Sequence, residues 1–231
     1  MGCTNCSSKG GCSARKGKEK ELLAELLPEL YPGRRWGEPD DEARFRRGVP
    51  EREARHLARR LSAELRAPVS FRPGGDDELC DYIYVLCVGR APGLVELRDA
   101  QELDVPDGDH LRERYLRVAL SSMARVAAVQ EVAFELDREQ GDYVIREKPR
   151  DGVYDPILLQ RTQKLIELLV EHDVTYFDFG LIAKPVSRYV EGFFDGDYEE
   201  RYGTAAATVN YLFYPQPATA IGSAYIPARG A

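Results

Sequence analysis

Three cysteines lie within the first twelve residues of this chain, and their side chains are the ones best suited to chemistry. Cys3, Cys6 and Cys12 have the spacing C-x2-C-x5-C. Two intervening residues let both sulfurs of a cysteine pair face one metal ion, and Gly10 and Gly11 let the chain turn back toward that ion. Nearby lysine and arginine side chains favour the thiolate form that binds metals. The pattern predicts a metal site on an N-terminal arm.

A tetrahedral metal ion or a cluster needs about four ligands, and the arm supplies three. Cys80 is the internal candidate for the fourth ligand, because it follows a polar loop and precedes an apolar strand. An exogenous thiolate, a water molecule and a partner protein are the alternatives. Cys87 lies seven residues further along the same strand, so it faces the opposite side of the sheet and is expected to be a core thiol.

The type of metal follows from the ligands that the arm offers. It has no histidine, and three cysteines without a clear fourth favour an iron–sulfur cluster, of the 4Fe-4S type, over zinc. The spacing differs from the bacterial ferredoxin run, and no proline follows the last cysteine. Zinc, or a metal-free arm with redox-labile thiols, is the alternative. The predicted ligands are Cys3, Cys6, Cys12 and Cys80.

The first residues also fit a different interpretation, lipid modification. Gly2 is placed for myristoylation and Cys3 for palmitoylation, and a basic patch follows them. Position 6 of a myristoylation signal is usually serine or threonine, however, and here it is Cys6. Lipid modification also leaves Cys12 and its two preceding glycines without a role, so the metal site is the preferred interpretation.

The common catalytic signatures are missing from the sequence. It contains no G-x-x-x-x-G-K-[ST], G-x-G-x-x-G, G-x-S-x-G or H-E-x-x-H. Asp178-Phe179-Gly180 resembles the magnesium-binding tripeptide of protein kinases, but the glycine-rich loop, strand lysine and catalytic loop of a kinase are absent. A pocket carboxylate such as Asp178 is a weaker enzymatic alternative. Three isolated histidines are expected to be helix-surface or capping residues: His56, His110 and His172.

Charge and hydropathy restrict the class of protein. The chain has 231 residues and a formal charge of −7. Residues 1–20 contain five basic side chains and one acidic side chain, so the rest of the chain is more acidic than the whole. An acidic body argues against nucleic acid as a partner. No apolar run approaches the roughly 20 residues of a transmembrane helix, and the polar start lacks a secretory signal. We therefore expect a cytoplasmic protein, where clustered cysteines bind metal more often than they form disulfides.

The spacing of apolar residues predicts the elements that position these groups. Helices are expected at about 19–31, 50–67, 110–130 and 155–172, with short helical pieces at 186–194 and 204–213. Strands are expected at 69–71, 82–88, 95–97 and 174–179, and a hairpin from 132–136 and 143–147. Together they predict an α+β domain, residues 19–231, with a mixed or antiparallel sheet flanked by helices. Residues 1–18 are expected to be a flexible, cysteine-rich metal-binding arm.

These observations lead to two functional hypotheses. The first is an iron–sulfur (or zinc) binding protein that acts in electron transfer, in redox sensing or as an accessory subunit of a redox system. The second is a non-enzymatic interaction or adaptor domain whose cysteine tail is incidental or lipid-modified. Under this second hypothesis, the eleven aromatic residues between Tyr176 and Tyr214 form either the core or a groove that binds a partner protein. A protein partner is expected under both hypotheses.

Overall fold

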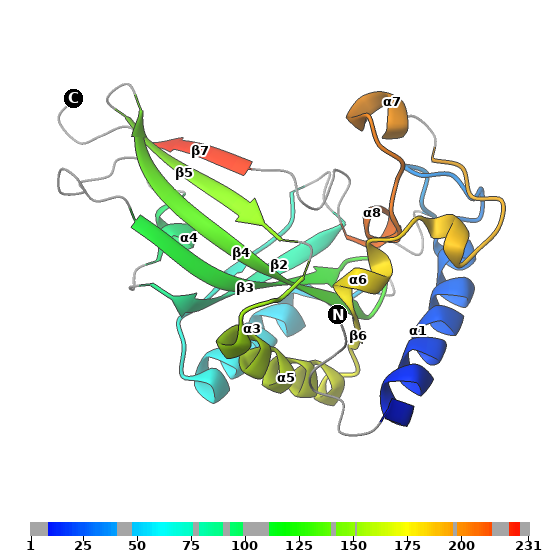
Figure 1. The fold of residues 1–231 in the computed structure, drawn as a ribbon, viewed down its shortest axis with the longest axis horizontal. Coiled ribbons are helices and arrows are strands. Elements are labelled where there is room, and N and C mark those ends of the chain that lie inside the picture. The colour runs from blue at the N-terminus through cyan, green and yellow to red at the C-terminus, as the bar shows by residue number, and fades with distance from the viewer. Residues whose placement is uncertain are drawn as a thin grey trace.

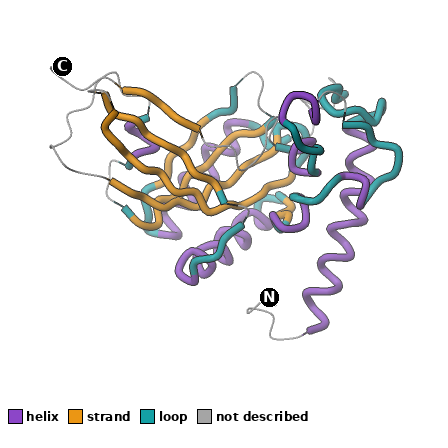
Figure 2. Tube along the Cα trace, turned by 45° about the horizontal axis from the view of Figure 1, so that its top comes forward, coloured by secondary structure: helices purple, strands orange, loops and turns teal. Residues whose placement is uncertain are grey.

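A seven-stranded mixed sheet lies at the centre of the computed structural model, with helices on both of its faces (Figures 1 and 2). The predicted α+β class, a single domain with a mixed sheet flanked by helices, is confirmed. The division into an arm and a body stays a prediction. The structure describes residues 9–40, 48–75, 79–89, 93–98, 111–139, 142–150, 152–195, 198–213 and 222–226, and for residues 9–17, 222, 223 and 225 the backbone alone.

Six strands follow one another across the sheet, each antiparallel to its neighbour: β1 (Val69–Arg72), β2 (Cys80–Val88), β3 (Leu111–Ser121), β4 (Val126–Glu139), β5 (Asp142–Pro149) and β7 (Gly222–Ile226). The predicted hairpin is the β4–β5 pair. β4 is long enough to pair with two strands along one edge. Its C-terminal part pairs with β5, and Val126–Ala128 pairs in parallel with β6 (Thr175–Phe177).

Two sets of helices cover the two faces of this sheet. α3 (Glu51–Leu65) and α5 (Pro156–Glu171) pack on the face that we call the helical face, against Ile83, Leu116 and Val118. The opposite face, called the inner face, is covered by α1 (Lys9–Leu30), α4 (Leu94–Leu97), α6 (Phe179–Ile182), the 3-10 helix Val186–Arg188, α7 (Tyr198–Tyr202) and α8 (Thr208–Leu212). Both faces of the central strands are therefore buried.

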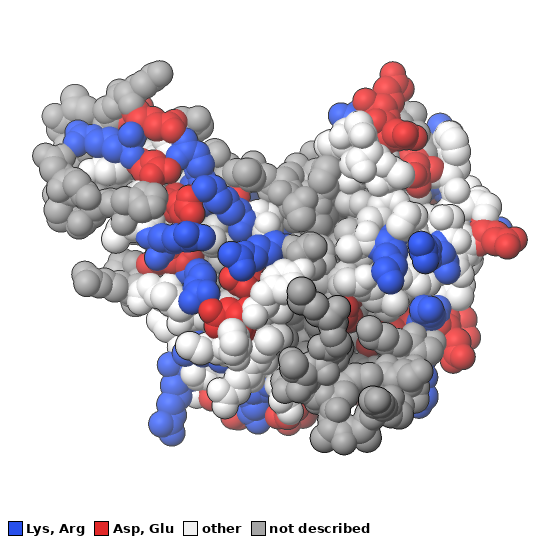
Figure 3. All heavy atoms as spheres, in the orientation of Figure 1, with Lys and Arg blue, Asp and Glu red and all other residues white. Residues whose placement is uncertain are grey.

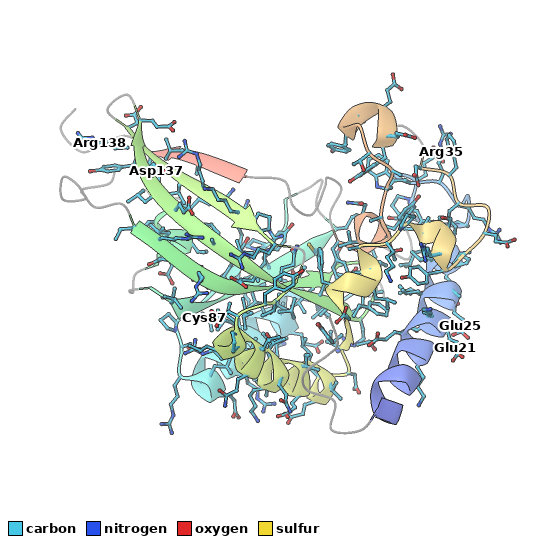
Figure 4. The ribbon with its side chains drawn as sticks, in the orientation of Figure 1. Glu21, Glu25, Arg35, Cys87, Asp137 and Arg138 are labelled. Atoms are coloured by element: carbon cyan, nitrogen blue, oxygen red, sulfur yellow. The ribbon has the colours of Figure 1, made fainter. Side chains whose placement is uncertain are left out.

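The N-terminal helix α1 is joined to the body by its C-terminal third. Leu23, Leu27 and Leu30 are fully buried at helical spacing, while Glu21 and Glu25 lie on the exposed outer side (Figure 4). The helix begins at Lys9, about ten residues earlier than predicted, and its N-terminal part extends away from the sheet (Figure 2). No helix in the described part of the chain is both long and apolar enough to cross a membrane.

The start of α5 is the local feature that the sequence predicts best. Asp155 Oδ1 accepts hydrogen bonds from the backbone N–H groups of Ile157 (2.8 Å) and Leu158 (3.4 Å), as an N-cap residue does. Arg114 of β3 donates to Asp155 Oδ2 at 2.6 Å. This hydrogen bond and the backbone N–H groups lower the pKa of Asp155. The predicted helix after Asp155-Pro156 is confirmed.

Two predicted elements are wrong. Within the helix predicted at 110–130, residues 111–130 instead form β3 and the start of β4, joined by the turn at 122–125. The stripe of Leu116 and Leu120 fits a helix as well as a strand, because strands buried on both faces lose the alternation of polar and apolar residues. Likewise, residues 95–97 belong to the one-turn helix α4, where the Glu96 carboxylate accepts the N–H of Gly93 (2.5 Å).

Candidate functional site

The predicted metal ligands of the arm fall mostly outside the described residues. Cys3 and Cys6 lie there, and Cys12 lies in the first turn of α1, where the backbone alone is described. Gly10 and Gly11 belong to the same turn, so in this conformation they continue the helix and do not reverse the chain. The positive end of the helix dipole lies at this turn and favours a thiolate. The arm as a ligand set stays a prediction.

Cys80, the predicted fourth ligand, is a core side chain. It is 1% exposed and belongs to the inner-face core together with Leu23 and Leu27 of α1. Its Sγ donates to the backbone carbonyl of Phe213 at 3.2 Å. Binding a metal would require the thiol to give up this carbonyl and leave the core. Its role as a ligand stays a prediction, and the geometry gives it a structural role in addition.

Cys87 packs on the helical face and Cys80 on the inner face, so the two lie on opposite sides of the sheet, as their separation of seven residues predicts. It is half-buried rather than fully buried, at a bulge where the register shifts between Leu86 and Val88. Burial raises the pKa of the Cys87 thiol, although a hydrogen bond from Arg161 of α5 opposes this. A thiol with a raised pKa is a weak nucleophile and a weak metal ligand at neutral pH.

The inner face holds a buried network of charged side chains that the sequence analysis missed. Glu147 of β5 accepts from Arg117 of β3 (2.5 Å to Oε1) and from Arg98 (2.7 Å to Oε2). The side chains of Arg117 and Glu147 are each 8% exposed. Arg117 also donates to Gln130 Oε1 of β4 (2.5 Å), and Gln130 donates to the carbonyl of Arg150 (2.8 Å). Charged residues inside apolar strands were the signal that could have revealed this network.

Two tyrosines extend the network toward α4. Tyr115 donates to Glu113 Oε2 (2.5 Å), which also accepts the backbone N–H of Leu94 (2.6 Å). Tyr84 packs edge-on against the Tyr115 ring and lies with its hydroxyl 3.5 Å from Glu147 Oε1. Burial, followed by the neighbouring carboxylates, raises the pKa of both tyrosines far above the usual value. Both hydroxyls are therefore hydrogen-bond donors at neutral pH and cannot act as bases there.

Hydrogen bonds within the network satisfy both of its carboxylates. Glu147 pairs with the guanidinium groups of Arg98 and Arg117, and Glu113 accepts from the Tyr115 hydroxyl and the backbone N–H of Leu94. Buried ions are stable in a protein when they are paired and hydrogen-bonded in this way. No member of this set is held ready as a nucleophile or a general base. We therefore interpret the network as a structural device that fixes α4 on the sheet.

A second polar cluster lies between α3, α5 and the β3–β4 turn. Glu53 of α3 accepts from both terminal nitrogens of Arg125 (3.1 and 2.6 Å), and Arg125 also donates to the carbonyl of His172 (2.6 Å). The ring of His172 lies 5.7 Å from that of His56. Its Nδ1 is 3.9 Å from Glu53 Oε1, which is too far for the hydrogen bond of a catalytic dyad. As predicted, His56 lies on the surface of α3 and His172 is the C-terminal cap of α5; His110 lies outside the described residues.

The aromatic residues of the C-terminal third belong mainly to the inner-face core. Phe177, Tyr211 and Phe213 are fully buried, and Tyr211 packs edge-on against Tyr31 with ring centroids 5.1 Å apart. Among the described members of this group, Phe194 is the exposed exception, at 60%. These rings join α1 to the segments that follow β6, so they are better explained as core than as a partner groove.

The outer part of the helical face carries a mosaic of opposite charges, visible over β3, β4 and β5 in Figure 3. Acidic side chains of β4 lie between basic side chains of its two neighbours. Glu135, for example, pairs with Arg112 of β3 (3.3 Å) and with Lys148 of β5. The hydrogen bond from Lys148 is the main reason why the pKa of Glu135 is lowered. A surface of matched pairs offers no uniformly basic area for a nucleic acid.

Among the described residues, no group of three or more histidine, cysteine, aspartate or glutamate side chains is arranged to hold a metal ion, and this includes the surroundings of Asp178. No family model matches the sequence, and no curated protein or solved structure matches the chain.

Proposed function

We propose that this protein carries an iron–sulfur cluster, with zinc as the alternative metal, on Cys3, Cys6 and Cys12 of its N-terminal arm. The observation that carries the proposal is the C-x2-C-x5-C spacing at the start of the chain. In the first hypothesis above, the cluster serves electron transfer, redox sensing or a larger redox system as an accessory subunit. The body then acts as the carrier of the cluster.

The position of the arm supports a carrier function. The arm leads directly into α1, whose leucines pack into the inner-face core at the far end of the helix. A helix of 22 residues is about 33 Å long. Cys12, in the first turn of α1, therefore lies at the end of the helix that extends away from the sheet (Figure 2). A cluster held by thiolates is anionic, and the positive end of α1 and the lysines of residues 9–20 stabilise such a charge.

The arm needs a fourth ligand, and the fold makes Cys80 a poor source for it. Its thiol is buried and hydrogen-bonded to the carbonyl of Phe213. We propose that an exogenous thiolate, a water molecule or a ligand from a protein partner completes the site. A cluster with one exchangeable ligand can contact a redox partner directly, which suits electron transfer or sensing.

Metal and sulfide analysis of anaerobically purified protein, together with its visible absorption spectrum, tests this proposal. The wild-type chain is compared with the Cys3→Ser/Cys6→Ser/Cys12→Ser triple variant and with Cys80→Ser as the matched control. We expect iron, sulfide and a broad visible absorption band in the wild type and in Cys80→Ser, and loss of all three in the triple variant. Circular dichroism verifies that each variant is folded.

The other results are equally informative. Loss of iron in Cys80→Ser with a folded domain would restore Cys80 as the internal fourth ligand. Zinc without sulfide would make the arm a zinc site. Absence of metal from the wild type would refute the proposal and leave the interaction-domain hypothesis, with or without lipid on Gly2 and Cys3, which intact mass spectrometry of protein from a eukaryotic host would detect.

A further inference from the structure

A groove of about 340 Å³ runs between α3 and β1 on the helical face. Its lining combines basic and apolar groups: Arg55, Ala58, Arg59, Ser62, Val69 and Phe71. The guanidinium carbon of Arg55 lies over the ring of Phe71, 4.6 Å from its centroid. Three residues connect α3 to β1, so the helix and the strand run back along each other and the groove follows both of them.

One wall of the groove is an edge of the sheet. β1 is the first strand in the sheet order and pairs with β2 alone among the described strands. The N–H of Leu86 donates to the carbonyl of Pro68, so Pro68 is opposite Leu86 in a hydrogen-bonded pair. Such pairs recur at every second residue of an antiparallel ladder, so the main-chain N–H and C=O groups of Ser70 and Arg72 also point toward β2. Val69 and Phe71 alternate with them, and their N–H and C=O groups point outward. Nothing in the described part of the chain pairs with these groups.

The other wall carries a stripe of arginines. Arg52, Arg55 and Arg59 follow one another at intervals of three and four residues, which places them on one face of α3, and all three are exposed. Glu51 forms an exposed pair with Arg55 (2.7 Å), and Arg52 and Arg59 have no acidic partner among the described residues. This basic stripe belongs to a chain with a net charge of −7.

We propose that β1 is a docking edge for an extended acidic segment of a partner protein. The segment adds to the sheet as a new strand, and its main chain pairs with the outward groups of Val69 and Phe71. Every second side chain of that strand, at a spacing of about 7 Å, faces the groove. Arg55 and Arg59 are separated by about 6 Å along the helix, so acidic residues at alternate positions match them. This inference does not depend on the cysteine arm.

Charge complementarity selects this occupant over a second copy of the chain. Pairing β1 with the β1 of another copy would bring two arginine stripes together, and like charges across an interface weaken association. An acidic segment instead gives Arg55 and Arg59 opposite charges. The side chains between the acidic ones point to the opposite face of the sheet, beside Ser70 and Arg72.

Fluorescence anisotropy of the full-length protein tests the proposal. The probe is a short fluorescein-labelled peptide in which glutamate alternates with valine and threonine, and lysine replaces glutamate in the control peptide. Arg55→Glu/Arg59→Glu is the test variant, and Arg188→Glu, an exposed arginine elsewhere, is the control for a change of charge. We expect the double variant to bind at least about tenfold more weakly, because each attractive pair becomes repulsive.

Two further measurements separate strand addition from simple attraction of charge. N-methylation of the probe at alternate amides removes either the N–H groups that face β1 or those that face away. We expect methylation of the amides that face β1 to abolish binding and methylation of the amides that face away to preserve it. Val69→Pro removes an outward donor without breaking a bond to β2, and it should weaken binding while the circular dichroism spectrum is retained.

Several outcomes would overturn the proposal. The first is that the double variant binds the glutamate peptide as tightly as the wild type does. The second is that the wild type binds the lysine control peptide as tightly as the glutamate peptide. The third is that both N-methylated peptides bind with the same affinity. Sedimentation of the wild type as a dimer that Val69→Pro dissociates would assign the edge to a second copy of the chain and would also refute an acidic partner strand.

Discussion

The buried pair of Arg117 and Glu147 permits a quantitative test of how the inner face is stabilised. Glu147→Gln removes the carboxylate that neutralises two guanidinium groups, those of Arg117 at 2.5 Å and Arg98 at 2.7 Å. Arg117 is left as an uncompensated buried charge, which should destabilise the protein by about 3–5 kcal/mol. Arg117→Met is expected to be milder, about 1–3 kcal/mol, because Glu147 keeps Arg98, which is only 19% exposed.

The double variant distinguishes a coupled pair from two independent side chains. In Arg117→Met/Glu147→Gln neither the guanidinium of Arg117 nor the carboxylate is present. The loss of stability should then be smaller than the sum of the single losses by about 2 kcal/mol. The exposed pair of Arg55 and Glu51, treated in the same way, is the control and should show a coupling of about 0.5 kcal/mol or less.

Urea unfolding provides the measurement. The single tryptophan, Trp36, reports the region around α7 by fluorescence, and far-ultraviolet circular dichroism reports the sheet. Coincident transitions with an unchanged m-value allow the free energies of the four proteins to be compared. Additive losses, with a coupling near zero, would refute the reasoning, because they would show that the network is not held together by its charges.

Three further predictions follow from local geometry. The hydrogen bond from Arg125 lowers the pKa of Glu53 from its usual 4.5, so Glu53→Gln should lose about 0.5–1 kcal/mol at neutral pH, relative to the wild type. In urea titrations that difference should begin to decrease as the pH falls below 4.5 and should disappear once the pH is below the lowered pKa of folded Glu53, where both proteins are uncharged at this site; a pH-independent difference would contradict it. Gly48→Ala should destabilise the protein by about 2 kcal/mol or more, since the new Cβ would lie 2.1 Å from the carbonyl oxygen of Ser122; an unchanged urea midpoint would contradict this. Arg66 ends α3 in the left-handed region of backbone conformation (φ 48°), which glycine adopts without strain. Arg66→Gly should therefore raise the thermal midpoint and stabilise the protein by about 0.5–1 kcal/mol. Arg66→Ala keeps the strain, so this control should bring no such gain.

The sequence predicts well those parts of the fold in which short-range interactions decide the structure. The leucines of α1 recur at helical spacing and are buried on one side, and Asp155-Pro156 begins α5 through hydrogen bonds that reach only two and three residues ahead. In the β4–β5 hairpin, Glu139 pairs with Asp142, so the paired strands are only two residues apart in the sequence. In each case the groups that stabilise the element lie next to one another in the chain, so their pattern can be read without knowledge of the fold.

The candidate sites divide in the same way. The cysteine arm is visible in the sequence because its ligands lie within twelve residues, and its metal stays a prediction. The docking edge is not visible, since it requires that β1 be placed at the end of the sheet and that the arginines of α3 be turned toward it. The burial of Cys80 under the carbonyl of Phe213 also depends on a contact between residues 133 positions apart.

By itself, the sequence determined the α+β class, the helices α1 and α5, the hairpin and the acidic character of the body, because local spacing and composition specify them. The tertiary structure alone decided that residues 111–121 form a strand, because β2 and β4 supply its hydrogen bonds and the two layers of helices bury both of its faces. It also decided which charges meet. Arg117 and Glu147 are 30 residues apart and form a pair only because the sheet brings β5 within reach of β3 across β4.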